Sequence, residues 1–179
     1  MIGGREIPWY LADGAINIAN TIEHAESPAV GQLVTATVAG GQPWTIAART
    51  NYVPATNGKY LFDSQSGRII VGAGSIGTGE NGWYTTDSGW KNVAPFAAGN
   101  HTYFLISNGT AVQMYRDGVA VGTPGNSNEG IGGSTRWRST WSNPASSVWP
   151  AEVPVAAIYN IALDATQRTA LHTSMMDFT

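Results

Sequence analysis

The sequence predicts an all-β protein, built as a two-sheet antiparallel sandwich with one short C-terminal helix. Three observations predict this class. Charged residues make up only 12% of the 179 residues, whereas glycine is frequent, with 22 copies. Short β-branched or aromatic runs recur roughly every ten residues between turn residues, which is typical of a sandwich. Only the C-terminal segment shows a helical spacing of apolar residues.

The clearest element is a three-stranded antiparallel meander over residues 101–123. Its three apolar runs are separated by Asn108-Gly109 and Asp117-Gly118. These dipeptides are typical of two-residue hairpin turns, because both central positions need a positive φ that Asn, Asp and Gly tolerate. The segment therefore predicts three neighbouring strands of one sheet.

Upstream of the meander, the pattern predicts a series of short strands joined by loops. The expected strands cover residues 33–38, 44–49, 60–63, 68–71, 83–86 and 90–93. A four-residue loop at 64–67 and a turn at 87–89 join two pairs of them as hairpins. Residues 23–28 are expected to form a loop or one irregular turn, and residues 72–82 a glycine-rich surface loop.

Downstream of the meander, residues 124–130 are expected to be a turn-rich linker. Residues 131–149 should begin with a short strand end and continue as a long irregular loop, and residues 154–159 form the last strand. Asp164 then predicts a helix N-cap, with Gln167 as its capping-box partner.

The expected helix has one face suited to packing on a sheet. Arg168, Leu171 and Met175 follow one another at a spacing of three or four residues, which places them on one side of a helix. No internal repeat or domain boundary is visible. We expect residues 31–179 to form the sandwich, and residues 1–30 to contribute short strands or a docking arm within the same compact unit.

Three motifs, in this order and spacing, resemble the laminin-G-like and concanavalin A-like jelly-roll domains. Residues 44–48 are similar to an early core strand of that family. Residues 101–123 carry an aromatic-apolar strand, Asn-Gly, a strand ending in Tyr-x-Asp-Gly, and Val-x-Val-Gly. Residues 155–164 are similar to the closing strand that leads into a short helix. The resemblance covers about residues 32–175, and it implies a jelly roll of the kind found in bacteriophage virion surface proteins.

The chain departs from the family at the positions that could hold calcium. Pro154 and Val155 stand where family members usually carry acidic residues before the closing strand. Calcium needs a set of oxygen ligands, and this chain has no dense acidic cluster. We therefore expect no metal site and no cofactor.

Several function classes find little support in the sequence. The nine basic residues form no block, so a nucleic-acid partner is not expected. No apolar run approaches the ~18 residues of a membrane span, and the N-terminus shows no signal-peptide pattern. No expected strand carries acidic residues at i and i+2 or i+4, which disfavours a glycoside hydrolase with paired carboxylates. His24, His101 and His172 lack metal-ligand spacing, so no catalytic residue is expected.

Aromatic residues in polar surroundings are the best signal for a binding site. An aromatic ring in a polar loop suits stacking on a sugar or anchoring a protein interface, and a neighbouring Arg adds hydrogen bonds. The alternative is that these rings fold back over the open end of the sandwich. The candidate binding residues are Trp83, Tyr84, Trp90, Arg136, Trp137, Arg138 and Trp141.

The resemblance to this family, together with the lack of a catalytic or metal-binding motif in the sequence, favours a non-enzymatic virion surface protein of a bacteriophage. Capsid decoration protein, head fibre and tail appendage are the expected roles, for a homo-oligomer made in the host cytoplasm. Its partners would be the major capsid protein or other virion proteins, with a host surface glycan as a further partner. The alternative is an extracellular carbohydrate-binding module or lectin, and a glycoside hydrolase is a third reading.

Overall fold

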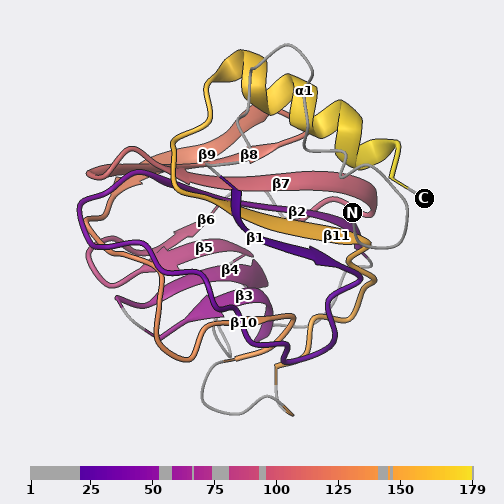
Figure 1. Ribbon diagram of the computed structural model, residues 1–179, viewed down its shortest axis with the longest axis horizontal. Coiled ribbons are helices and arrows are strands. Elements are labelled where there is room, and N and C mark those ends of the chain that lie inside the picture. Colours follow the sequence, from indigo (N-terminus) through magenta and orange to yellow (C-terminus); the bar gives the residue numbers. More distant parts are fainter. Residues whose placement is uncertain are drawn as a thin grey trace.

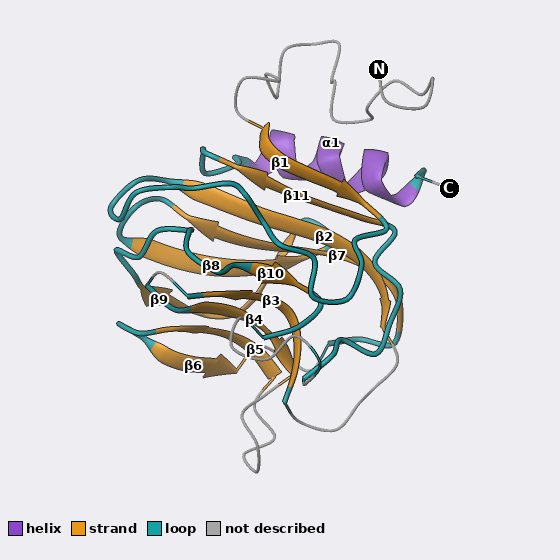
Figure 2. Cartoon of the chain, turned by 60° about the horizontal axis from the view of Figure 1, so that its bottom comes forward, coloured by secondary structure: helices purple, strands orange, loops and turns teal. Residues whose placement is uncertain are grey.

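The computed structural model describes residues 21–52, 58–65, 67–73, 81–92, 96–140, 145 and 147–178. Two antiparallel sheets face each other, and a helix lies on the outer face of the larger sheet (Figure 1). The larger sheet has the order β1 (Thr21–Glu26), β11 (Val155–Tyr159), β2 (Trp44–Tyr52), β7 (Gly99–Ser107), β8 (Ala111–Arg116) and β9 (Val119–Asn126). The smaller sheet has the order β10 (Arg136–Trp137), β3 (Lys59–Ser64), β4 (Ile69–Ala73), β5 (Asn81–Thr85) and β6 (Gly89–Asn92). The predicted class, an antiparallel sandwich with one C-terminal helix, is confirmed (Figure 2).

The main core lies between the two sheets and is rich in large aromatic side chains. Side chains alternate between the two faces of a strand, so every second residue points into this core. In β2, Trp44, Ile46 and Ala48 face it, whereas Ala47 belongs to the cluster beneath the helix. Trp44 also donates from its indole Nε1 to the Glu129 carbonyl at 2.9 Å, so its polar atom is satisfied although the ring is fully buried.

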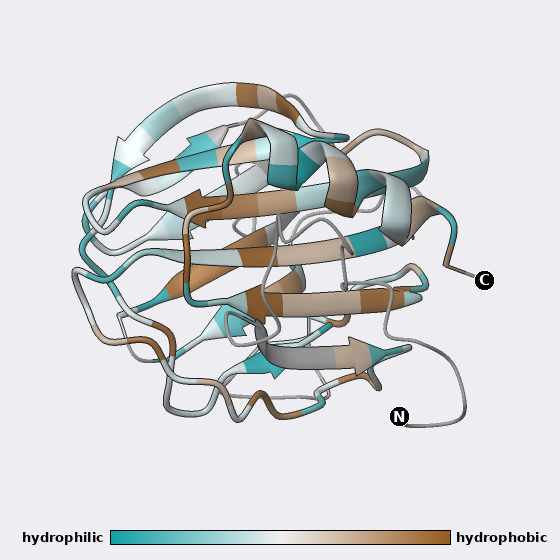
Figure 3. Cartoon of the chain, turned by 45° about the horizontal axis from the view of Figure 1, so that its top comes forward, coloured by the Kyte–Doolittle hydropathy of each residue, from teal (hydrophilic) through white to brown (hydrophobic). Residues whose placement is uncertain are grey.

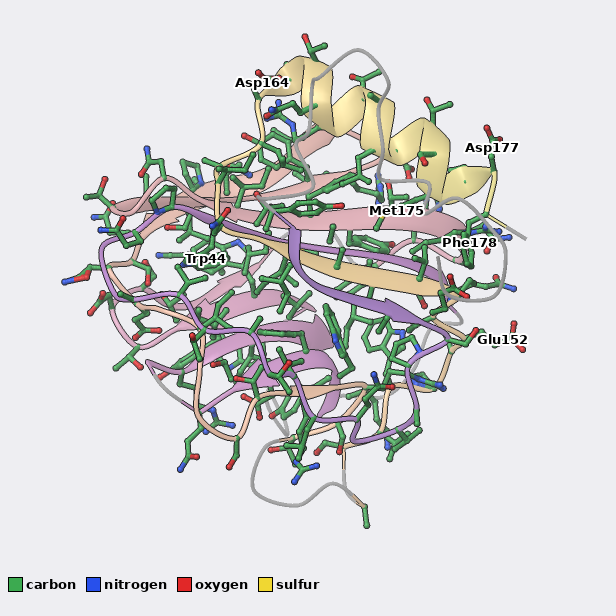
Figure 4. All side chains as sticks on the ribbon, in the orientation of Figure 1. Trp44, Glu152, Asp164, Met175, Asp177 and Phe178 are labelled. Atoms are coloured by element: carbon green, nitrogen blue, oxygen red, sulfur yellow. The ribbon has the colours of Figure 1, made fainter. Side chains whose placement is uncertain are left out.

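Helix α1 (Ala165–Met176) covers a second, smaller core on the outer face of the larger sheet (Figure 3). Leu171 and Met175 are fully buried against that sheet, as the spacing predicted. The predicted capping box is also confirmed: Asp164 Oδ1 accepts from the Gln167 amide, and Gln167 Oε1 accepts from the Asp164 amide, each at 2.9 Å. The side chains of this region are shown in Figure 4.

An arginine from the sheet secures the other end of the helix. Arg49, on β2, donates from Nη1 to the carbonyls of Met175 and Met176 at 3.1 and 3.2 Å, and also to the Phe178 carbonyl. The last carbonyls of a helix have no partner within the helix. The guanidinium therefore supplies the donors that the C-terminal turn needs.

The predicted meander is present as β7, β8 and β9, but its two turns differ. At the second turn Asp117 and Gly118 have φ values of +52° and +81°, as a two-residue type I′ turn requires. At the first turn three residues, 108–110, connect the strands, and the Asn108 amide donates to the Ala111 carbonyl at 3.1 Å, so the prediction of Asn108 and Gly109 as the two central residues of a tight turn is wrong. Hydrogen bonds to the Asn108 side chain explain this difference.

Asn108 holds this first turn with its side chain rather than with a left-handed backbone. Its Oδ1 accepts from the backbone amides of Thr110 and Ala111 at 3.0 and 2.8 Å. Such Asx turns compete with regular strand pairing. The positive φ, +97°, falls on Gly109.

Three predictions made from local propensity are wrong. Residues 23–28, expected as a loop, largely belong to β1, an edge strand that pairs with β11. Residues 33–38, expected as a strand, form only two isolated bridges, Leu33 with Arg136 and Val38 with Ile131. The two-residue strand β10 lies inside the expected irregular loop. In each case pairing with a segment distant in sequence decides the outcome.

Candidate functional site

The outward face of the smaller sheet brings several predicted site residues into one row. Arg136 pairs with Asp63, Asp63 with Ile70, Ile70 with Tyr84, and Tyr84 with Trp90. Directly paired residues point to the same side of a sheet. The row therefore crosses all five strands on one face.

The neighbouring row shows which side this is. Trp137 pairs with Phe62, Phe62 with Val71, and Val71 with Trp83, and all four side chains belong to the core between the sheets. Because consecutive residues of a strand point to opposite faces, the row that contains Tyr84 and Trp90 points away from the larger sheet.

Tyr84 and Trp90 form an aromatic pair on this outward face. Their ring centroids lie 5.6 Å apart and their planes meet at 56°. Both side chains are half-buried, so each ring keeps part of its surface open. A phenol and an indole each combine an apolar ring face with a polar edge. This geometry suits a ligand that has both an apolar face and hydroxyl groups.

A buried carboxylate lies between Arg136 and Ile70 in the row. Asp63 has no exposed surface, and Thr140 Oγ1 donates to its Oδ2 at 2.9 Å. Arg68 Nε lies 3.5 Å from Asp63 Oδ1, while 40% of the Arg68 side chain remains exposed. Burial of a carboxylate is costly unless it has such partners. Asp63 thus anchors a guanidinium group at the surface.

Tyr60 adds a third aromatic ring near this polar centre. Its ring packs over Gly72, where a Cβ atom would lie 2.9 Å from Tyr60 Cδ1. Burial raises the pKa of the Tyr60 hydroxyl; Arg68 opposes this effect and Asp63 adds to it. The phenol therefore remains neutral at physiological pH and is able to donate a hydrogen bond.

Two of the predicted binding residues are core residues instead. Trp83 and Trp137 have no exposed surface. Trp137 packs edge-to-face on Phe62 with centroids 5.0 Å apart. The inward register of β5 and β10 leaves neither ring able to stack on an external ligand, which corrects their prediction as stacking platforms. Trp141 lies outside the described residues.

Arg136 and Arg138 hold the segment after β1 against the edge of the smaller sheet. Arg136 Nη1 donates to the Gly31 carbonyl at 2.6 Å, and Arg138 Nη1 donates to the Pro28 carbonyl at 3.1 Å. Burial lowers the pKa of the Arg138 guanidinium, an effect that Glu152 opposes. Arg136 is thus the end of the outward row, whereas Arg138 lines a pocket.

Arg138 lines a pocket at the end of the sandwich. The pocket has a volume of about 390 Å³ and is lined by Ser27, Arg138, Glu152, Val153 and Pro154. Sequence reasoning missed all of these residues except Arg138, because three chain segments far apart in sequence build the pocket. It also missed Tyr60, Asp63 and Arg68, although the alternation of the 60–63 and 68–71 hairpin was a signal for their common face.

Other site types find no counterpart in the part of the chain that the structure describes. No group of three or more His, Asp or Glu residues there could hold a metal ion. Among the same residues, no helix is long and apolar enough to cross a membrane.

Comparison with known proteins supports the fold at low sequence identity. No family model matches the chain, and no curated protein sequence matches it significantly. Domain 4 of AbnA, a GH43 extracellular arabinanase from Geobacillus stearothermophilus solved with arabinotriose, superimposes with a TM-score of 0.56 at 17% identity, covering 88% of this chain and 84% of that domain. Trypanosoma rangeli sialidase, solved with 2,3-difluorosialic acid, gives a TM-score of 0.51 at 16% identity over 90% of this chain.

These likenesses are consistent with the jelly-roll, concanavalin A-like fold that the sequence motifs resemble. The chain spans only 29% of the sialidase, so the likeness to that enzyme concerns one part of it. The first neighbour is a domain of an arabinanase and the second is a sialidase. Neither comes from a bacteriophage, so the predicted phage link gains no support from them.

Proposed function

We propose that this protein is a non-enzymatic carbohydrate-binding β-sandwich that holds a glycan on the outward face of its smaller sheet. The observation that carries the proposal is the Tyr84–Trp90 pair, half-buried on that face with ring centroids 5.6 Å apart. A sugar ring presents a face of C–H groups that packs on such rings, and its hydroxyl groups can reach the polar atoms beside them.

The surrounding polar groups support the same ligand class. Arg68 offers donors from a guanidinium that Asp63 holds in place, and Tyr60 offers a neutral phenol hydroxyl. Ligand sites commonly combine an apolar surface with a few fixed polar groups. Domain 4 of the arabinanase was solved with arabinotriose, and the superposition covers 84% of that domain. This likeness adds an analogy of fold.

The distribution of carboxylates supports binding without hydrolysis. Glycoside hydrolases of the usual kind need two carboxyl groups about 5–10 Å apart. In the described part of the outward row Asp63 is the sole carboxylate, and it is buried and occupied by Thr140 and Arg68. We therefore infer a binding protein rather than a hydrolase.

A virion-surface role remains a second candidate, and one surface feature favours it. Strand β9 forms an edge of the larger sheet, and most of its side chains are exposed, including Val119 with 68% of its surface open. Such an edge offers unpaired backbone groups that a second chain can extend. In this role the protein would be a homo-oligomer that decorates a capsid, head fibre or tail through major capsid or other virion proteins.

A glycan array with matched variants tests the main proposal. The wild-type chain should bind a subset of oligosaccharides, and Trp90→Ala and Tyr84→Ala should abolish that binding. Val119→Ala, on the other sheet, serves as the control and should bind like the wild type. If no glycan binds, or if Trp90→Ala binds normally, the proposal is wrong.

Light scattering, with and without virus particles, addresses the second candidate. A stable oligomer that co-sediments with particles would support the virion role. A monomer that ignores the particles would remove it, while leaving glycan binding open to the array.

A further inference from the structure

The pocket at the end of the sandwich has a backbone unlike that of its surroundings. Ser27 and Arg138, which both line it, have φ values of +43° and +59°. Non-glycine residues at positive φ are uncommon and cost free energy, and they concentrate at functional sites. Hydrogen bonds maintain the geometry: the Ser27 amide donates to the Pro154 carbonyl at 2.8 Å, and the Arg138 amide donates to the Leu61 carbonyl at 2.8 Å.

Arg138, which lines the pocket, is a hydrogen-bond donor. Arg138 has five N–H donors, and its Nη1 is bound to the Pro28 carbonyl at 3.1 Å. Its Nε is buried and has no hydrogen-bond partner among the described residues. Arg138 therefore has further N–H donors besides the one bound to Pro28.

Glu152, which also lines the pocket, is a hydrogen-bond acceptor. Glu152 is exposed, and its backbone carbonyl accepts from Thr50 Oγ1 at 2.8 Å and from the Asn51 amide at 3.3 Å. Figure 4 shows its side chain at the edge of the molecule. The Glu152 carboxylate acts on Arg138 electrostatically, yet the two form no ion pair among the described residues. Both groups therefore keep hydrogen-bonding capacity for a ligand.

The remaining wall is apolar and the space is small. Val153 and Pro154 line the pocket beside the two charged groups. At about 390 Å³, the pocket lies near the lower end of the ~300–1,000 Å³ range of small-molecule sites. This size suits a single ring rather than an extended chain.

We propose that this pocket binds one neutral sugar ring, through neighbouring hydroxyl groups that accept from Arg138 and donate to Glu152. A hydroxyl group both donates and accepts, so a pair of hydroxyls satisfies a guanidinium and a carboxylate together. The pocket lining has one positive and one negative side chain, so it offers no net charge to attract an anion or a cation. The inference rests on the proposed carbohydrate-binding function and adds a second site to it.

The two sites lie at opposite ends of the smaller sheet. Arg138 directly follows β10, whereas Trp90 lies on β6, and these strands are the two edges of that sheet. Four strand spacings of about 4.8 Å separate them, or roughly 19 Å. The pocket should therefore bind a monosaccharide independently of Trp90.

An NMR titration tests the pocket with simple probes. Glucose, galactose and arabinose serve as neutral sugars, and glucuronate and inorganic phosphate as anions, each added to the ¹⁵N-labelled full chain. We expect at least one neutral sugar to shift the amide signals of Arg138 and Val153. We expect the anions to leave them unchanged.

Three variants separate the pocket from the aromatic face. Glu152→Gln should weaken binding of the neutral sugar by about fivefold or more, because a hydrogen bond to a carboxylate contributes roughly 1 kcal/mol more than one to the neutral amide that replaces it. Asp177→Asn, which changes another exposed carboxylate, and Trp90→Ala should change the pocket affinity by less than about twofold, well below one such bond. Circular dichroism melting checks that each variant folds.

The outcomes distinguish this inference from the proposed function. Glycan binding that depends on Trp90, with no neutral sugar in the pocket, overturns the pocket alone. Tighter binding of glucuronate or phosphate than of neutral sugars overturns the ligand class. A chain that binds no carbohydrate at either site overturns both proposals.

Discussion

Replacing Trp137 by alanine should destabilise the fold far more than replacing Trp90. Both tryptophans lie in segments rich in polar residues, and both were candidate binding residues. The structure places the Trp137 ring in the core with no exposed surface, edge-to-face against Phe62 at 5.0 Å. It leaves the Trp90 ring half-buried on the outward face.

The burial of each ring sets the expected magnitude. Truncation of a buried tryptophan to alanine costs about 3–5 kcal/mol. Because a domain is stable by only about 5–15 kcal/mol, Trp137→Ala should remove a large share of the free energy of unfolding. For a domain of this length the melting temperature should fall by about 6–20 °C, at roughly 2–4 °C per kcal/mol. Trp90→Ala loses mainly its cross-strand partner Tyr84, and should cost about 1 kcal/mol or less.

Urea unfolding followed by far-ultraviolet circular dichroism measures both effects without relying on tryptophan fluorescence. Trp137→Phe is the matched control. It retains a ring beside Phe62 and removes an indole N–H that has no partner among the described residues, so it should cost less than the alanine variant. If Trp90→Ala costs as much as Trp137→Ala, or if Trp137→Ala costs less than about 1 kcal/mol, the inward register of β10 is wrong.

Three further predictions concern the helix, a turn and a partly buried acid. Asp164→Ala should lower the free energy of unfolding by about 1 kcal/mol, whereas Asp164→Ser should retain most of the cap; equal urea midpoints for the two would argue against the capping box. Gly118→Ala should cost about 1–2 kcal/mol, because φ is +81° and no atom lies within 4 Å of an added Cβ, so that the backbone alone is strained; an unchanged midpoint would rule out the type I′ turn. Burial raises the pKa of the Glu129 carboxyl above its usual 4.5, against hydrogen bonds from Thr86, so folding favours the protonated form. The stability of the wild type relative to Glu129→Gln should therefore fall as the pH rises through the interval between the usual and the raised pKa, and a relative stability that rises with pH would contradict this assignment.

The elements predicted correctly are those with local signals. Alternation of apolar residues identified β2, β3, β4 and the meander, and Asp117-Gly118 identified the tight turn. The capping box at Asp164 identified the start of the helix. These features depend on residues within a few positions of one another, so a single sequence contains the information.

The elements that were missed depend on partners far along the chain. The second half of strand β1, residues 23–26, contains no β-branched residue. Its pairing partner is β11, more than a hundred residues later in the chain. Residues 33–38 have the alternation of a strand, and Val34, Ala36 and Val38 are buried, yet only two bridges form beside residues 131–136. Propensity cannot identify such partners.

The candidate site was predicted in part for the same reason. The sequence singled out Trp83 and Tyr84 together, but adjacent residues of a strand point to opposite faces, and register with β4 decides which one is buried. The sequence predicts a loop around Trp137, because its strand has only two residues. Arg138 was predicted as a binding residue because it is next to Trp137. Its pocket, however, is also lined by Ser27 and Glu152, which come from other segments of the chain.

The most direct test of the account is an NMR titration that follows the indole N–H signals. The full chain has seven tryptophans, and single Trp→Phe variants assign the signals of Trp83, Trp90 and Trp137. Addition of the oligosaccharide that binds best on the array should shift the Trp90 indole signal, while the Trp83 and Trp137 signals stay in place. Saturation of the protein without any shift at Trp90 would contradict the claim that the outward face of the smaller sheet holds the glycan.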